Sequence, residues 1–197
     1  MQENKYIGDE KMIKMLEHYK CPTPLDVVKM RFVGAICSPN LELRPTDVIS
    51  SFWPSGKAPR LQTKDEADLF FKFFMGLWDD IFERVKNNKI KLEKLSYKDL
   101  FEYFERRFVC IEQGFVEGFW GGNTDIKMPA YLAKLIDSMS ELSGAYSGLN
   151  YKLAKGGNKE EITTALKSVD AMVEKTIAYI IEKSVLPRIE SLQRTVN

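Results

Sequence analysis

The residues best suited to nucleophilic chemistry are His18 and Cys21, which lie three positions apart. That spacing brings two side chains close together on a helix, so a Cys–His nucleophile is conceivable. Pro22 follows the cysteine at the point where the helix is expected to end, and an exposed histidine beside a small apolar cysteine is the competing interpretation. Because the chain contains a single histidine, a metal site with two histidine ligands from one chain is excluded.

The remaining cysteines, Cys37 and Cys110, form no C-x-x-C pair with each other or with Cys21. Neither a zinc ribbon nor a thioredoxin-like site is therefore expected. The chain also lacks a glycine-rich phosphate loop and a Gly-x-Ser-x-Gly motif. We predict no catalytic, cofactor-binding or metal-binding residue and no cofactor. Three unpaired cysteines are typical of a reducing compartment, which favours a cytoplasmic protein.

Two sets of acidic residues could supply an acid and a base: Asp79 with Asp80, and Glu112 with Glu117. They would do so only if an apolar pocket separated their pKa values, and solvated helix faces are the simpler interpretation. The segment 84–94 is locally basic, but no aromatic residues alternate with its cations. Since 29 Lys and Arg balance 28 Asp and Glu, we expect neither nucleic-acid nor membrane binding.

Glycines inside helical patterns are the most informative residues. Gly114 and Gly118 lie one turn apart, and Gly34 stands within another apolar segment. A glycine within a helix costs about 1 kcal/mol relative to alanine, so another interaction should offset that cost. We predict close helix crossings at these positions, with a partner or ligand at the bare backbone as the alternative. At Gly118 we expect leucine to destabilise the fold and alanine to be tolerated or mildly harmful.

The elements that position these residues are predicted from apolar residues that repeat every three to four positions. A capping box of Thr63 and Glu66 opens a helix whose apolar stripe ends near position 85. Ser96 with Asp99 resembles a second start signal, followed by a stripe over 100–119. The residues Met128-Pro129 open a third long helix, with a stripe at Leu132, Leu135, Met139, Leu142, Tyr146 and Leu149.

A turn at 155–158 leads into a final helix, which Asn158 is expected to cap together with Glu161. Its apolar stripe runs from 162 to 180. Such a short connection implies an antiparallel helical hairpin. Shorter helices are expected at about 9–20, 24–38 and 45–53, followed by a loop over 54–62. The fold class is therefore all-α: a compact bundle of about seven helices that ends in an antiparallel hairpin. One domain is expected over 1–197.

Two segments resemble a known family of bacterial proteins. Phe32-Val33-Gly34-Ala35-Ile36-Cys37-Ser38-Pro39 resembles the Phe-Leu-x-Gly-Leu-Leu-Cys-Gly-Pro opening of the YecA/YgfB-like family. The segment from Ile111 to Phe119 is similar to the family's second signature, Trp-x-x-Gly-Phe-Leu-x-Gly-Phe, with Ile111 in place of tryptophan. The resemblance extends over roughly 25–184 and does not include the Cys-rich metal-binding module of the YecA branch.

The resemblance implies an all-α bacterial protein of the cytoplasm, and a homodimer as one state it could adopt. It brings no reaction and no catalytic residue. We therefore favour a non-enzymatic protein-binding or regulatory protein whose partner is unknown. The alternative is an enzyme or small-molecule-binding protein with a pocket near Trp78, Trp120 and the glycine-bearing helix. An exposed apolar groove would favour the protein-binding hypothesis. A closed, polar-lined cavity would favour an enzyme or a small-molecule-binding protein.

Overall fold

The computed structural model describes residues 5–54, 57–95, 97–123 and 125–196. Of these, 72% are helical and none lies in a strand, which confirms the all-α prediction. The helical segments join into seven continuous rods: α1 (Asp9–His18), α2 (Leu25–Cys37), α3 (Pro45–Ser50), α4 (Lys64–Lys86), α5–η1–α6 (Leu100–Val109, Cys110–Val116, Glu117–Trp120), α7 (Ala130–Ala154) and α8–η2–α9 (Lys159–Ile180, Ile181–Val185, Leu186–Val196). None of the helices in the described ranges is long and apolar enough to cross a bilayer.

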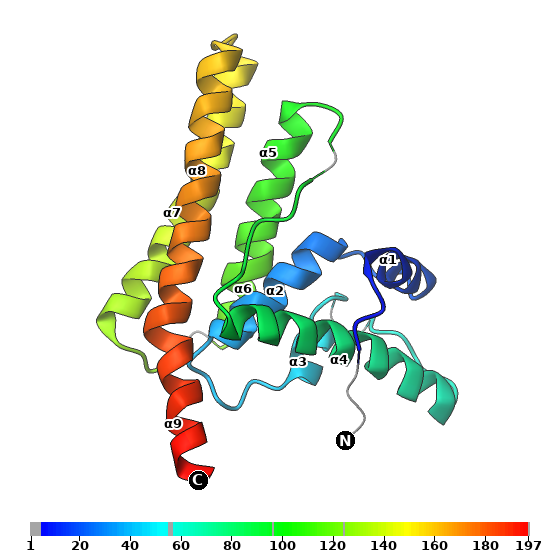
Figure 1. Ribbon diagram of the computed structural model, residues 1–197. Coiled ribbons are helices and arrows are strands. Elements are labelled where there is room, and N and C mark those ends of the chain that lie inside the picture. Colours follow the sequence, from blue (N-terminus) through cyan, green and yellow to red (C-terminus); the bar gives the residue numbers. More distant parts are fainter. Residues whose placement is uncertain (1–4, 55–56, 96, 124, 197) are drawn as a thin grey trace.

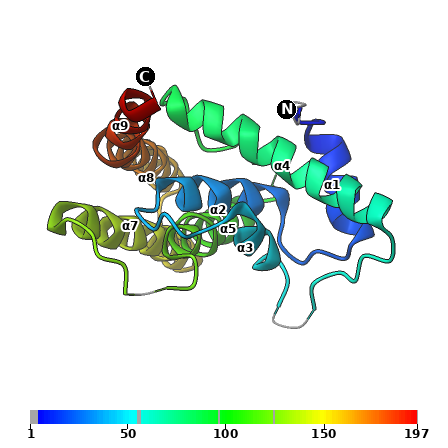
Figure 2. The same cartoon turned by 90° about the horizontal axis from the view of Figure 1, so that it is seen from below.

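Helix α2 lies at the centre of the molecule, and all thirteen of its residues are buried. Its sequence is apolar on every side apart from Asp26, Lys29 and Arg31, which is the pattern of a fully enclosed helix. The α5–η1–α6 rod packs along it, and α1, α3 and α4 also contact it. Figure 2 shows α2 surrounded by these elements. Any polar group on α2 must therefore find its partners inside the protein.

The predicted start signals are confirmed where the structure describes them. The hydroxyl of Thr63 accepts a hydrogen bond from the backbone N–H of Glu66 at the start of α4. Asn158 likewise accepts from the backbone of Glu160 and Glu161 at the start of α8. At α5 the N-cap is Asp99, while Ser96 lies outside the described residues. These side chains satisfy backbone donors that a helix leaves without partners in its first turn.

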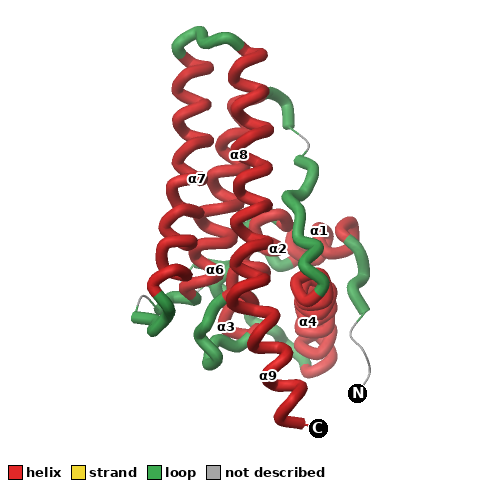
Figure 3. Tube along the Cα trace, turned by 60° about the vertical axis from the view of Figure 1, so that its left-hand side comes forward, coloured by secondary structure: helices red, strands yellow, loops and turns green. Residues whose placement is uncertain are grey.

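Helices α7 and α8 form the predicted antiparallel hairpin (Figures 1 and 3), and α5 stands beside it (Figure 1). All six stripe residues expected on α8 are buried. On α7, Leu135 and Leu142 are only half-buried, and Ile136 and Ser143 are buried in addition to the other expected positions. The predicted stripe was wrong there because α7 packs against both α5 and α8, which widens its buried face.

Two π-helical segments interrupt the long rods, and the sequence patterns did not predict them. The second, η2, precedes Pro187, whose ring nitrogen has no proton to donate to the carbonyl of Lys183 one turn earlier. That carbonyl instead accepts a hydrogen bond of 3.2 Å from the Tyr131 hydroxyl. A local change of helical pitch and an external donor therefore let the rod continue through the proline into α9.

Helix α9 closes the carboxyl end of α2 through Arg188. Its Nη1 and Nη2 atoms donate to the carbonyl oxygens of Ser38 and Ile36, at 2.6 and 3.1 Å. A cation at this position also complements the negative end of the helix dipole. Helix α9 thus supplies hydrogen-bond donors to the carboxyl end of α2.

Candidate functional site

The site begins where α2 crosses the α5–η1–α6 rod at two glycines. A Cβ atom built on Gly34 would overlap the carbonyl oxygen of Phe115, and one built on Gly118 would overlap the carbonyl oxygen of Arg31. Both obstacles are backbone atoms, which cannot turn aside as a side chain can. The crossing is therefore tighter than the sequence alone indicated. Of the two outcomes expected for Gly118→Ala, tolerated or mildly harmful, this overlap with backbone atoms favours the harmful one.

Gly114 lies in η1 on the same side of the rod. A Cβ there would come within 3.0 Å of the Met30 Cβ and 3.3 Å of the Val27 carbonyl oxygen. This contact is also close, although less severe than the other two. The three glycines singled out by the sequence thus lie along one helix–helix contact, which brings the two backbones together.

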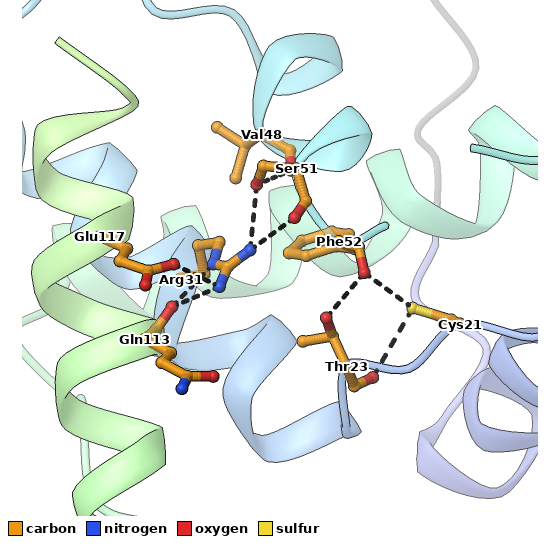
Figure 4. Close-up of polar contacts among 8 residues, drawn as sticks. All are labelled: Cys21, Thr23, Arg31, Val48, Ser51, Phe52, Gln113 and Glu117. Atoms are coloured by element: carbon orange, nitrogen blue, oxygen red, sulfur yellow. Dashed lines mark hydrogen bonds and ion pairs between the residues drawn. The ribbon is translucent and has the colours of Figure 1, made fainter. Parts of the chain in front are cut away.

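Arg31 enters this crossing from the centre of α2, and its side chain is only 9% exposed. Its Nε and Nη2 atoms donate to the Gln113 carbonyl oxygen at 2.8 and 2.6 Å. Nη2 also donates to Glu117 Oε2 at 2.8 Å, and Nη1 donates to the carbonyl and hydroxyl oxygens of Ser51 at 2.8 and 3.2 Å. Figure 4 shows this fan of contacts. They account for all five N–H donors of the guanidinium.

The environment of Arg31 sets its electrostatics. Burial lowers the pKa of the guanidinium below its ordinary value, and the Glu117 carboxylate opposes that change. The guanidinium carbon also lies 5.7 Å from the centre of the Phe52 ring. Because every donor already has a partner, Arg31 cannot bind an additional anion without losing a protein contact. Its role is to hold Glu117 and the π-helical backbone in place.

Two hollows adjoin the cluster, and Arg31, Ser51 and Glu117 line both of them. The first measures about 610 Å³ and has apolar walls from Leu43, Val48, Val116 and Trp120. The second measures about 660 Å³ and has walls that include Phe52, Trp53, Pro22, Pro24 and Pro54. We call these two hollows together the acidic groove. Both are partly open to solvent.

The name follows from the charges of the groove. Five carboxylates and two cations line it, which gives a net charge of −3, whereas the whole chain carries +1. The carboxylates are Asp47, Glu102, Glu105, Glu112 and Glu117, and the cations are Arg31 and Arg106. A concave surface with a net negative charge concentrates its electrostatic potential, so this groove attracts positive charge.

Several of these carboxylates are already oriented by the protein. One oxygen of Glu117 is held by Arg31, one of Glu112 accepts from the Ser143 hydroxyl at 2.7 Å, and one of Asp47 accepts from the Arg44 backbone at 3.1 Å. The Glu117 side chain is nevertheless 57% exposed. A second carboxylate oxygen can accept from a ligand while the first keeps its partner.

The two tryptophans suggested by the sequence have different surroundings. Trp120 lines the acidic groove beside Gly118. Trp78 instead packs edge-on against Phe32, with ring centres 5.2 Å apart, at the contact between α4 and α2. The pocket that we expected near both tryptophans therefore involves Trp120, while Trp78 contributes to the core.

The thiol of Cys21 does not have the setting of an activated nucleophile. It lies 3.7 Å from the carbonyl oxygens of Thr23 and Phe52, to which it donates. Burial raises its pKa, so the protonated thiol is favoured over the reactive thiolate. His18 is exposed and its ring packs against Tyr19. Within the described ranges, no group of three His, Cys, Asp or Glu side chains is arranged to hold a metal ion.

Comparisons of the chain with protein-family models, curated proteins and solved structures found no match. The resemblance to the YecA/YgfB-like family therefore stays a prediction that rests on the two glycine-containing segments.

Sequence reasoning missed Arg31 as the organising residue of the site. The sequence did contain a signal for Arg31, because this charged residue interrupts the apolar run Met30-Arg31-Phe32-Val33. The rest of the helix is mostly apolar, which is typical of a buried helix. A charged residue in such a position needs partners inside the protein. The identity of those partners, 20 to 86 positions away, could not be read from the chain.

Proposed function

We propose that this chain is a non-enzymatic protein-binding protein of the cytoplasm, of the YecA/YgfB-like type. The acidic groove holds a segment of a partner protein that carries both basic and apolar side chains. The observation that carries the proposal is the net charge of −3 on a concave, partly apolar surface of a nearly neutral chain.

The shape and chemistry of the groove favour an extended segment as its occupant. Its two hollows meet at the Arg31 cluster, so a segment can occupy both while passing over Glu117. Trp120 in one hollow and Pro54 in the other supply surfaces for apolar side chains. Aromatic and apolar anchors at the centre of an interface, with charges around them, are typical of protein recognition.

The charges have a second consequence, because they determine which partners are rejected. A partner segment with acidic side chains would meet five carboxylates and two cations in the groove, and a net excess of like charge disfavours association. Arg31 offers such a segment no compensation, since its donors already bind Gln113, Ser51 and Glu117. The groove therefore selects for basic segments by repulsion as well as attraction.

The test uses two peptides that differ only in charge: acetylated, amidated Lys-Leu-Lys-Gly-Lys-Leu-Lys and its counterpart with glutamate at every lysine. Isothermal titration calorimetry at low ionic strength should detect binding of the basic peptide and none of the acidic one. Binding of the basic peptide should weaken as salt is raised, because salt screens exposed charges.

A matched pair of double variants locates the binding surface. Glu105→Gln with Glu117→Gln removes two groove charges, whereas Asp137→Asn with Glu141→Gln removes two from the outer face of α7, where both residues are exposed. We expect at least a fivefold loss of peptide affinity in the first variant and no change in the second. Urea unfolding of each variant verifies that it is folded. Equal affinity in both variants, or equal binding of both peptides by the parent, would refute the proposal.

A further inference from the structure

A third hollow, of about 500 Å³, lies between α1, the start of α2 and the segment 93–95. Its apolar walls include Ile13, Leu16 and Leu25, and its polar lining includes Asp26 and Arg106. The two polar residues form an ion pair, in which Arg106 Nη2 lies 2.7 Å from Asp26 Oδ1. A hollow of this size suits a small organic molecule.

The ion pair is incompletely satisfied. Asp26 Oδ2 and Arg106 Nε are both buried and have no hydrogen-bond partner, and the Asp26 side chain is only 8% exposed. A buried polar atom without a partner costs about 1–3 kcal/mol. Such atoms are rare in native proteins, and a water, an ion or another bound molecule is one way in which they gain a partner. The unpaired acceptor belongs to Asp26 and the unpaired donor to Arg106, so both lie within one ion pair.

We propose that this hollow binds a small molecule that carries a primary carboxamide on an apolar body. The amide N–H donates to Asp26 Oδ2, and the amide carbonyl accepts from Arg106 Nε. Both orphaned atoms then gain the type of partner that they lack. The apolar body lies against Ile13, Leu16 and Leu25.

Other polar groups fit this hollow less well. A carboxylate could accept from Arg106 Nε but would repel Asp26. An ammonium could donate to Asp26 Oδ2 but would leave Arg106 Nε unpaired and would lie near its positive charge. Lys29 does not change this preference, because it already donates to Asp9 and Glu93 at 2.7 and 3.1 Å. The carboxamide is neutral and supplies a donor and an acceptor on one planar group.

Arg106 also provides the route of entry. Its side chain is 38% exposed, whereas that of Asp26 is almost enclosed. Because both orphaned atoms are buried, the proposal requires the guanidinium to turn about its long, flexible stem as the ligand enters. Arg106 and the segment 22–24 line both this hollow and the acidic groove. The two proposals are nevertheless tested apart, because Asp26 lines only this hollow, and Glu105 and Glu117 line only the groove.

The experiment compares benzamide, benzoate and benzylamine, which share a ring and differ in the polar group. Ligand-detected nuclear magnetic resonance titrations of the full chain measure each dissociation constant. We expect benzamide to bind at least tenfold more tightly than either charged analogue. Similar affinities for all three compounds, or no binding of benzamide, would overturn the proposal.

Variants assign the binding to the orphaned atoms. Arg106→Lys keeps the positive charge but removes Nε, and at a half-exposed position it should leave the fold intact. We expect at least a tenfold loss of benzamide affinity in this variant and in Asp26→Asn. Glu17→Gln is the matched control, because Glu17 lines the same hollow and is exposed. Unchanged benzamide binding by Arg106→Lys, or an equal loss in Glu17→Gln, would contradict the assignment even if Asp26→Asn fails to fold.

Discussion

At the scale of single residues, the crossing of α2 and α6 depends on Gly118 and Arg31 together. The missing side chain of Gly118 lets the Arg31 backbone approach, and the Arg31 side chain then binds groups of η1 and α6. Enlarging the glycine would push apart the backbones that these hydrogen bonds join. Close packing and hydrogen bonding are therefore coupled at this point, and a change in one alters the other.

We expect Gly118→Ala to destabilise the protein by about 1–3 kcal/mol, because the new methyl group would overlap backbone atoms of Arg31. Gly144→Ala is the control within α7. A Cβ there meets nothing within 4 Å, so its better helix propensity should stabilise the protein by about 0.5–1 kcal/mol. Urea unfolding midpoints measure both changes. A midpoint for Gly118→Ala equal to the parent's would show that the helices can separate without cost.

Asp9 illustrates how one carboxylate attaches α1 to the rest of the protein. Its Oδ2 accepts from Lys29 of α2 at 2.7 Å, and its Oδ1 accepts from the Tyr6 hydroxyl at 2.6 Å. Burial acts to raise the pKa of Asp9, but hydrogen bonds from Lys29 and Tyr6 outweigh that effect and leave it below the ordinary 3.8. A depressed pKa means that the ionised group stabilises the fold above about pH 4.

We therefore expect Asp9→Asn to lower stability at pH 7 by less than about 1 kcal/mol, because the carboxylate is largely exposed. The difference from the parent should shrink as the pH falls below 3.8 and through the folded-state pKa. Urea unfolding at a series of pH values follows the difference, and a carbon-detected titration of Asp9 gives its midpoint directly. A midpoint at or above 3.8 would show that Lys29 does not stabilise the charge.

At the scale of elements, Asp170 of α8 joins three helices. It accepts from the hydroxyl of Tyr103 in α5 at 2.7 Å and from that of Tyr146 in α7 at 2.6 Å. Arg107 of α5 lies 3.5 Å away as a counter-ion. Because Tyr146 and Arg107 are buried, these groups depend on one another for partners. They fix the position of the hairpin relative to α5.

Removing one hydroxyl from this cluster tests its contribution. We expect Tyr146→Phe to destabilise the protein by about 1.5–3 kcal/mol, since a hydrogen bond to a charged group is lost. Tyr151→Phe provides the comparison on the same helix, where the side chain is 66% exposed, and its effect should stay within about 0.5 kcal/mol. Thermal unfolding of the two variants distinguishes them, and indistinguishable melting curves would contradict the expected role of Asp170.

At the scale of the whole molecule, buried apolar residues from α1 to η2 form one continuous cluster. Cys37 and Cys110 lie inside it, and Cys21 lies partly buried against it. Burial raises the pKa of both enclosed thiols to about 12. A reagent that needs the thiolate can therefore reach them only when the core opens.

The rate of alkylation by iodoacetamide at pH 8 should therefore differ between the partly buried Cys21 and the two enclosed cysteines. We expect Cys21 to be modified first, with Cys37 and Cys110 modified at a rate that tracks unfolding and rises sharply in urea. Mass spectrometry of the three cysteine-containing peptides measures each rate. Rapid modification of Cys37 or Cys110 in native buffer would show that the core opens locally around α2 or η1.

The sequence by itself determined the helices, most of their ends and the hairpin. The signals involved are local: Thr63 and Asn158 cap backbone groups two or three residues away, and apolar stripes follow the pitch of a single helix. It also identified Gly34 and Gly118 as unusual, because a glycine within a helix has an intrinsic cost at any position. Interactions between residues close in sequence were therefore sufficient to predict the helices, the hairpin and the unusual glycines.

Only the tertiary structure decided what those elements bring together. Arg31 and Gln113 are 82 positions apart, and Asp26 and Arg106 are 80 apart, so nothing in their spacing marks them as partners. The acidic groove likewise combines carboxylates from α3, α5, η1 and α6, each of which reads as an ordinary exposed residue in the sequence. The pairing of buried charges and the net charge of the groove both depend on the distances between helices. Those distances are set only when the whole core packs.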